Sequence, residues 1–125
     1  MSLLAADWIS EVSRGPDWLF VRLAPDAPIS SSEALLAENI CGLLEQQFLN
    51  RLVLELDELD RLQSELIGQL VLLHKRIVSR GGVMRITGLS EPGQQVLRMS
   101  RLETRFPCYT DRHAAVMGYR PEQPR

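Results

Sequence analysis

The chain has 125 residues, of which 45% are hydrophobic and 24% are charged, and this size and balance predict one globular domain with its own core and exclude a long disordered body. Its formal net charge of −2 excludes a general electrostatic attraction to nucleic acid. No stretch approaches the roughly 20 apolar residues of a membrane span, and the apolar run 3–6 lacks the basic flank of a secretory signal, so we expect a cytoplasmic protein.

The first elements expected are two short strands and a helix. Residues 18–23 are rich in aromatic and β-branched side chains and follow the turn signal Gly15-Pro16-Asp17, so we expect them to pair in a hairpin with residues 9–13. A helix should come next, because Ser30-Ser31-Ser32 offers N-cap hydroxyls and apolar residues then recur at helical spacing. These residues are Leu36, Ile40, Leu43, Leu44 and Phe48, and the helix is predicted to end near the last of them.

The middle of the chain alternates strand, helix and strand. Residues 51–57 are apolar at nearly every position, which is typical of a central strand covered on both faces. Ser64 is a possible N-cap for a helix through about Ser79, whose apolar residues form one broad stripe. Gly81-Gly82 is typical of the end of a helix, and residues 83–87 are the next predicted strand.

The last part predicts a third helix, a weak strand and a short helix. Ser90, followed by Pro92 in the first turn, begins a helix to about Ser100. Residues 106–109 are a weak strand, and Asp111 can cap a helix through residue 117. Strands alternating with helices require a mainly parallel sheet, so we predict the α/β class, with a four- to five-stranded mixed β-sheet flanked by about four α-helices. Residues 1–119 should form a single domain, and residues 120–125 a loose tail.

Residues that could carry chemistry are few and lack the spacing of a known motif. Cys41 and Cys108 have neither paired spacing nor nearby histidines, so we expect reduced, buried thiols rather than disulfides or a zinc site. His74 and His113 lack metal-ligand spacing, and His74 should pack at the edge of its helix. The sequence contains no nucleophile elbow, phosphate-binding loop or His-Glu-x-x-His arrangement. We therefore expect a protein that is not an enzyme and uses no cofactor or metal.

Charge is distributed unevenly along the chain. Acidic residues crowd the first half and arginines the second, which favours a polarised surface. Four acids, Asp57, Glu58, Asp60 and Glu65, surround the predicted turn before the second helix. For most of the other charges a solvated helix face that needs no partner is a sufficient explanation.

From Arg51 onward the sequence resembles the STAS domain, the fold of bacterial anti-sigma-factor antagonists and of the cytoplasmic tails of sulfate transporters. In those antagonists an aliphatic strand leads through a short turn to Asp-Ser-Ser/Thr-Gly-Leu-Gly at the start of the second helix, where this chain has Gln-Ser-Glu-Leu-Ile-Gly at 63–68. The family's aspartate, second hydroxyl and first glycine are Gln63, Glu65 and Leu66 here. The order of four further segments is also similar: His-Lys-Arg at 74–76 with Gly-Gly at 81–82, Ile-Thr-Gly-Leu-Ser at 86–90, Val-Leu at 96–97 through Leu102, and Phe-Pro at 106–107.

The resemblance implies a protein-binding module of the anti-sigma factor antagonist type, acting in a partner-switching circuit that controls transcription. The implied partner is a GHKL-type serine kinase that doubles as the anti-sigma factor and phosphorylates the serine at the Ser64 position. Ser64 is therefore the candidate phosphoacceptor, and a role as a helix cap alone is the equal alternative. The predicted partner-binding residues belong to the turn after Leu56 and the start of the second helix: Asp57, Glu58, Asp60, Gln63, Ser64, Glu65 and Gly68.

Several alternatives stay open at this point. Gly68 marks either the close approach of a partner or, as we prefer, close packing of the helix against a strand. A scaffold or accessory STAS domain would bind its own kind, for example as a homodimer, or a transporter complex. A small-molecule or nucleotide sensor would bind a ligand instead. In a last alternative, Glu65 and the neighbouring acids supply the negative field that phosphate supplies in other family members. The partner would then be a different or unregulated one.

Overall fold

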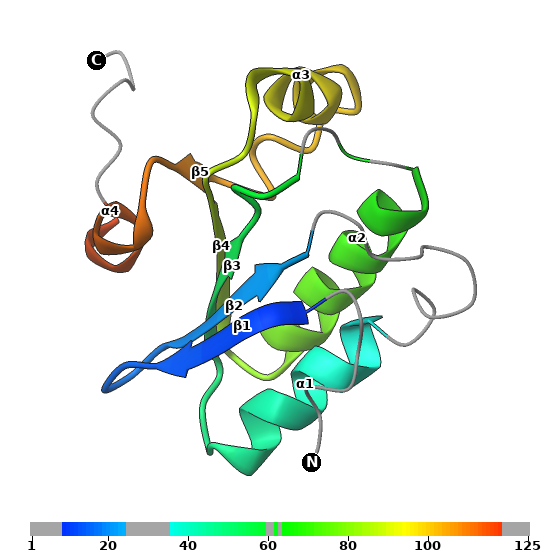
Figure 1. The fold of residues 1–125 in the computed structure, drawn as a ribbon. Helices are drawn as coiled ribbons and strands as arrows, with labels where there is room; N and C mark the ends of the chain where they lie inside the picture. The colour runs from blue at the N-terminus through cyan, green and yellow to red at the C-terminus, as the bar shows by residue number, and fades with distance from the viewer. Residues whose placement is uncertain (1–8, 25–35, 60–61, 63, 119–125) are drawn as a thin grey trace.

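A computed structural model describes residues 9–24, 36–59, 62 and 64–118, and these residues form a five-stranded sheet with helices on both faces (Figure 1). The strands are β1 (Ile9–Arg14), β2 (Leu19–Leu23), β3 (Arg51–Glu55), β4 (Val83–Thr87) and β5 (Cys108–Tyr109). They lie side by side in chain order, with β1 antiparallel to β2 and every other neighbouring pair parallel. The predicted fold class, mixed sheet and amino-terminal hairpin are therefore confirmed. The predicted tail at 120–125 lies outside the described residues.

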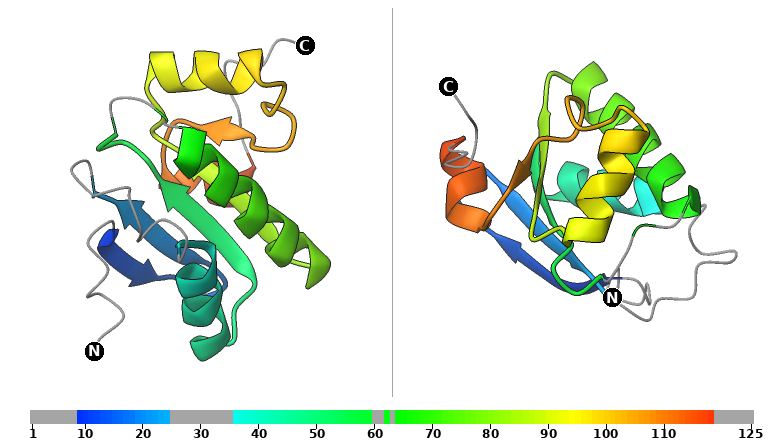
Figure 2. Two further views of the ribbon diagram at one scale, coloured as in Figure 1. Left: turned by 90° about the vertical axis from the view of Figure 1, so that its right-hand side faces the viewer. Right: turned by 90° about the horizontal axis from the view of Figure 1, so that it is seen from above.

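Four helices connect or follow these strands: α1 (Leu36–Gln46), α2 (Ser64–Ser79), α3 (Glu91–Met99) and α4 (Arg112–Met117). Helices α1 and α2 lie side by side against one face of the sheet, and α4 covers part of the opposite face (Figures 1 and 2). Helix α3 lies beyond the carboxyl end of β4. Within the described ranges, no helix has both the length and the apolar character needed to cross a membrane.

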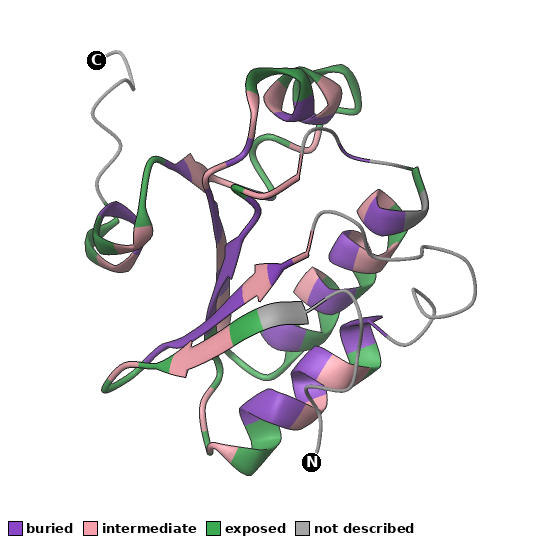
Figure 3. Cartoon of the chain, viewed as in Figure 1, coloured by how far each residue is buried: buried purple, intermediate pink, exposed green. Residues whose placement is uncertain are grey.

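Alternation along the strands divides the core into two layers. Val21, Leu52, Leu54 and Ile86 belong to the larger cluster, which packs against α1 and α2. The smaller cluster, on the α4 side of the sheet, contains Trp18, Phe20, Val53, Tyr109, Ala114 and Ala115. The central strands are accordingly buried along most of their length (Figure 3). This burial on both faces is what the unbroken apolar run of β3 predicted.

The helix boundaries follow the local signals in the sequence closely. Helix α2 ends at Ser79 as predicted, but Ser64, the expected N-cap, is its first helical residue. The Ser90 hydroxyl accepts a hydrogen bond from the Gly93 N–H (3.2 Å), and the Asp111 carboxylate accepts one from the Ala114 N–H (2.8 Å), so both predicted caps are confirmed. The serines at 30–32, which were expected to cap α1, lie outside the described residues.

Phe48 continues the apolar spacing of the first predicted helix but does not pack on the buried face of α1. The helix ends at Gln46, and Phe48 takes a left-handed φ of 57° that leaves its side chain 93% exposed. The Leu49 N–H donates to the Leu44 carbonyl (2.9 Å), which is the closing hydrogen bond of a Schellman motif. This turn places Leu49, rather than Phe48, against the core. Cys108 also departs from expectation, because it is only partly buried, whereas Cys41 is buried.

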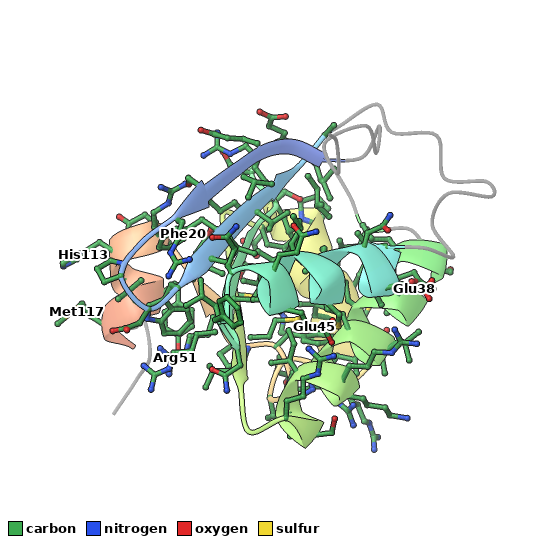
Figure 4. All side chains as sticks on the ribbon, turned by 90° about the horizontal axis from the view of Figure 1, so that it is seen from below. Phe20, Glu38, Glu45, Arg51, His113 and Met117 are labelled. Carbon is green, nitrogen blue, oxygen red and sulfur yellow. The ribbon has the colours of Figure 1, made fainter. Side chains whose placement is uncertain are left out.

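Arginine side chains hold the short helix α4 on its face of the sheet. The Arg85 guanidinium lies 5.3 Å from the centre of the Trp18 ring and donates a hydrogen bond to the Ala115 carbonyl (2.7 Å). Helix α4 therefore packs its alanines inward, and His113 and Met117 are exposed on its outer side (Figure 4).

Candidate partner-binding surface

The carboxyl ends of the four parallel strands meet at one edge of the sheet. Strands β2 to β5 end there at Leu23, Glu55, Thr87 and Tyr109. This is the edge at which open α/β sheets place their binding residues, because the connecting loops converge there. The turn after β3 and the start of α2, which the sequence singled out, both belong to this edge (Figure 1).

The turn after β3 is fixed in place by the neighbouring strand. The Leu56 N–H donates a hydrogen bond to the Thr87 carbonyl (2.9 Å), and Leu56 is fully buried. Gly88 adopts a φ of 70°, and a Cβ atom there would lie 2.6 Å from the Cβ of Asp57. Only glycine fits both the conformation and the space. The Asp57 side chain is thereby directed outward and stays 45% exposed, next to the partly exposed Glu58.

A buried carboxylate lies directly behind this turn. Glu55, the last residue of β3, is only 4% exposed. Its two carboxylate oxygens accept hydrogen bonds from Nε (2.8 Å) and Nη2 (2.9 Å) of Arg112 at the start of α4. Such a two-point pair compensates the cost of burying the charge and fixes the orientation of both side chains. The hydrogen bonds from Arg112 to Glu55 also raise the pKa of Arg112 above its ordinary value.

Arg22 of β2 connects the buried pair to the exposed turn. Its Nη2 lies 3.5 Å from Glu55, and its Nη1 lies 3.5 Å from Asp57 and 4.0 Å from Glu58. With Glu11 at 3.8 Å from the Arg22 Nε, the cluster contains four carboxylates and two guanidiniums. It is therefore acidic overall. A polar pocket of about 280 Å³ lies among Arg22, Glu55, Asp57, Thr87, Asp111 and Arg112.

Ser64 and Gly68 form the helical part of the surface. Ser64 is exposed at the first position of α2, and Gly68 follows on the same helix face because residues four apart are neighbours. Among the described residues, a Cβ atom at Gly68 would meet no atom outside its own stretch of helix within 4 Å. The preferred interpretation, that this glycine permits close packing against a strand, is therefore wrong. Gly68 is an exposed helix glycine that no internal contact explains.

The structure brings part of the predicted site together and does not describe the rest. Asp57 and Glu58 belong to the turn after β3, and Ser64 and Gly68 belong to the first turns of α2. Asp60 and Gln63, together with the side chain of Glu65, lie outside the described part of the chain. The pair of Glu55 and Arg112 and its link through Arg22 were not predicted from the sequence. A signal for Glu55 was present, because a carboxylate in a strand buried on both faces requires a partner.

The side chains of this site are suited to binding another molecule rather than to catalysing a reaction. Its side chains are carboxylates, guanidiniums and hydroxyls, most of them already paired with one another. No group of three or more histidine, cysteine or acidic residues that could hold a metal ion occurs among the residues with described positions. The geometry suits a docking surface that is rigid underneath and acidic at the rim.

The comparisons with known proteins agree with this architecture. The model of the STAS domain family matches residues 13–115, and the chain belongs to this family. Among solved structures, the protein TM1081 of Thermotoga maritima is similar with a TM-score of 0.76 at 19% identity, over 85% of this chain and 84% of that one. No curated protein matches the sequence.

Two further similar structures carry functional names. An anti-sigma factor antagonist of Mycobacterium paratuberculosis has a TM-score of 0.69 at 18% identity, over 90% of this chain and 94% of that one. The anti-sigma factor antagonist SpoIIAA in its unphosphorylated form has a TM-score of 0.68 at 13% identity, over 86% and 96%. At these identities the likeness establishes the fold that the chains share.

Proposed function

We propose that this chain is an anti-sigma factor antagonist that binds a GHKL-type anti-sigma kinase through the surface formed by the turn after β3 and the start of α2. The observation that carries the proposal is the exposed helix face at Ser64 and Gly68, on the helix that follows the acidic turn after β3. A glycine at an exposed helix position weakens the helix by about 1 kcal/mol relative to alanine. Close approach of a partner is a reason to keep it.

Membership of the STAS family and the names of two structural neighbours support this proposal. Those names apply to the other proteins, and we extend them to this chain because it has an exposed serine at the start of α2. The side chain is accessible to a kinase, and backbone N–H groups of the first turn would stabilise an added phosphate.

Phosphate on Ser64 would act mainly through charge. It adds about −1.5 to −2 charges at neutral pH to a surface that is already acidic. The added charge would repel acidic groups of a docked partner, while the fold stays intact. Ser64 would then switch the module between a bound and a released state.

The proposal is tested by mixing the protein with a GHKL-type anti-sigma kinase of the same organism. Without nucleotide the two should form a complex, and with ATP the protein should gain the mass of one phosphate, which is absent from Ser64→Ala. Ser64→Asp should bind the kinase more weakly than Ser64→Ala. The absence of any complex at about 100 μM would contradict antagonist function, and a complex without phosphate transfer would reject only the switch.

A further inference from the structure

A shallow groove lies at the far end of α2, between this helix and the loop that leads from α3 to β5. It has a volume of about 480 Å³ and is lined by His74, Lys75, Val78, Ser79, Thr104 and Arg105. Along the helix axis Lys75 lies about 16 Å from Ser64, at a rise of 1.5 Å per residue. The groove shares no residue with the acidic surface at the carboxyl ends of the strands.

Apolar groups form the base of this groove. Val78 is 50% exposed there, although it is a large aliphatic side chain. The ring of His74 packs edge-on against the buried ring of Phe106, with their centres 5.5 Å apart. The aliphatic stems of Lys75 and Arg105 add further apolar surface, because long cationic side chains expose mainly their charged ends. The groove can therefore bury an apolar side chain of a bound molecule.

The charged groups of the groove are cationic and have no counter-ion within it. No carboxylate is among its lining residues, and neither Lys75 nor Arg105 forms an ion pair with any residue that the structure describes. Other arginines of the chain do have such partners, as Arg98 has Glu91. Burial lowers the pKa of His74, and the positive charge of Arg105 lowers it further, which indicates a positive local field.

We propose that this groove binds an acidic segment of a partner protein, which places an apolar side chain on Val78 and carboxylates near Lys75 and Arg105. Charge complementarity identifies the occupant, because the groove supplies cations and lacks anions. A protein segment fits better than a free anion, since a free anion would leave the exposed valine uncovered. The arginine can bind a carboxylate at two points, which adds orientation to attraction.

The test uses NMR on the ¹⁵N-labelled full chain with two synthetic peptides of about 12 residues, which share the same leucines and carry either glutamate or lysine at the other positions. The glutamate peptide should shift the amide signals of Val78, Ser79 and Thr104 in a saturable manner. Arg105→Glu should weaken this binding by about tenfold or more, because a charge reversal replaces attraction by repulsion. Arg98→Glu, a matched reversal on α3, should leave it unchanged.

A second comparison reverses the charges of both the peptide and the groove. The lysine peptide should not bind the wild-type groove and should bind the variant Lys75→Glu/Arg105→Glu. Equal binding of both peptides to the wild type, or shifts confined to other residues, would overturn the proposal. Acetate or phosphate alone producing the same shifts would make this a small-anion site instead. Self-association that disappears in Arg105→Glu would replace the foreign partner with a second copy of the chain.

Discussion

Replacing Gly68 by alanine should stabilise the fold and weaken partner binding at the same time. Gly68 is exposed on α2, and an added Cβ would meet nothing within 4 Å in the rest of the described chain. The free chain therefore has no steric reason to resist the change. If a partner packs closely against the helix here, the new methyl group occupies space that the partner needs.

The two effects have opposite signs and similar sizes. Alanine in place of glycine inside a helix adds about 1 kcal/mol to the free energy of unfolding, which for a chain of this length raises Tm by about 4 °C. An extra methyl group in a packed contact costs about 1–3 kcal/mol. That cost corresponds to roughly 5- to 150-fold weaker binding of the kinase.

Gly42 provides a matched control on α1. A Cβ atom at Gly42 also meets nothing within 4 Å, and α1 contributes no residue to the proposed surface. Gly42→Ala should raise Tm in the same way and leave the affinity unchanged. Thermal unfolding and calorimetric titration with the kinase measure both quantities. If Gly68→Ala binds the kinase as tightly as the wild type does, our explanation of this glycine is refuted.

Three further predictions concern the buried pair, the histidine and the turn glycine. Arg112→Leu leaves the Glu55 carboxylate buried without its two-point partner, so it should lower the free energy of unfolding by about 2–4 kcal/mol in urea titration. The double variant Glu55→Leu/Arg112→Leu removes the buried charge as well and should restore most of this loss. His74 has a folded pKa below its unfolded value of 6.5, mainly through burial, so the unfolded chain binds more protons. Stability should therefore fall as the pH drops from about 7.5 to 5.5, and His74→Gln should flatten this dependence in urea titrations across that range. Gly88→Ala should lower the free energy of unfolding by about 2–4 kcal/mol, because the new side chain meets both a left-handed φ and a clash with Asp57. Gly81→Ala has a similar φ but open space, so it should lower the free energy of unfolding by only about 1–2 kcal/mol in the same assay.

Elements that depend on neighbours in sequence could be predicted well. The caps at Ser90 and Asp111 act over three residues, and the stripe of α2 repeats within one helix, so the signals are local. The true position of Phe48 could not be predicted in the same way. Its apolar side chain continues the spacing of α1, and only the closing turn at Leu49 decides which of the two residues is buried.

The candidate surface could be predicted only in part, because its support comes from distant residues. The ion pair of Glu55 and Arg112 joins positions 57 residues apart, and no local pattern specifies which of the many arginines is the partner. Gly68 is a different case. Leu66, Leu70 and Leu73 define the buried stripe of α2, and a residue two positions from Leu66 and Leu70 falls on the opposite side of a helix. The apolar pattern of α2 was therefore sufficient to predict that Gly68 is exposed.

Helix α2 relates the two proposed contacts to one another. The turn that precedes this helix is acidic, and the groove near its end is basic, with Lys75 about 16 Å from Ser64 along the helix axis. A single partner that engages both must present cations at Asp57 and Glu58 and carboxylates at Arg105, and reversing its orientation would place like charges together. Since each contact is exposed to solvent, added salt should weaken both by screening. The opposite charges of the two contacts would therefore determine the orientation of the partner more than the strength of the complex.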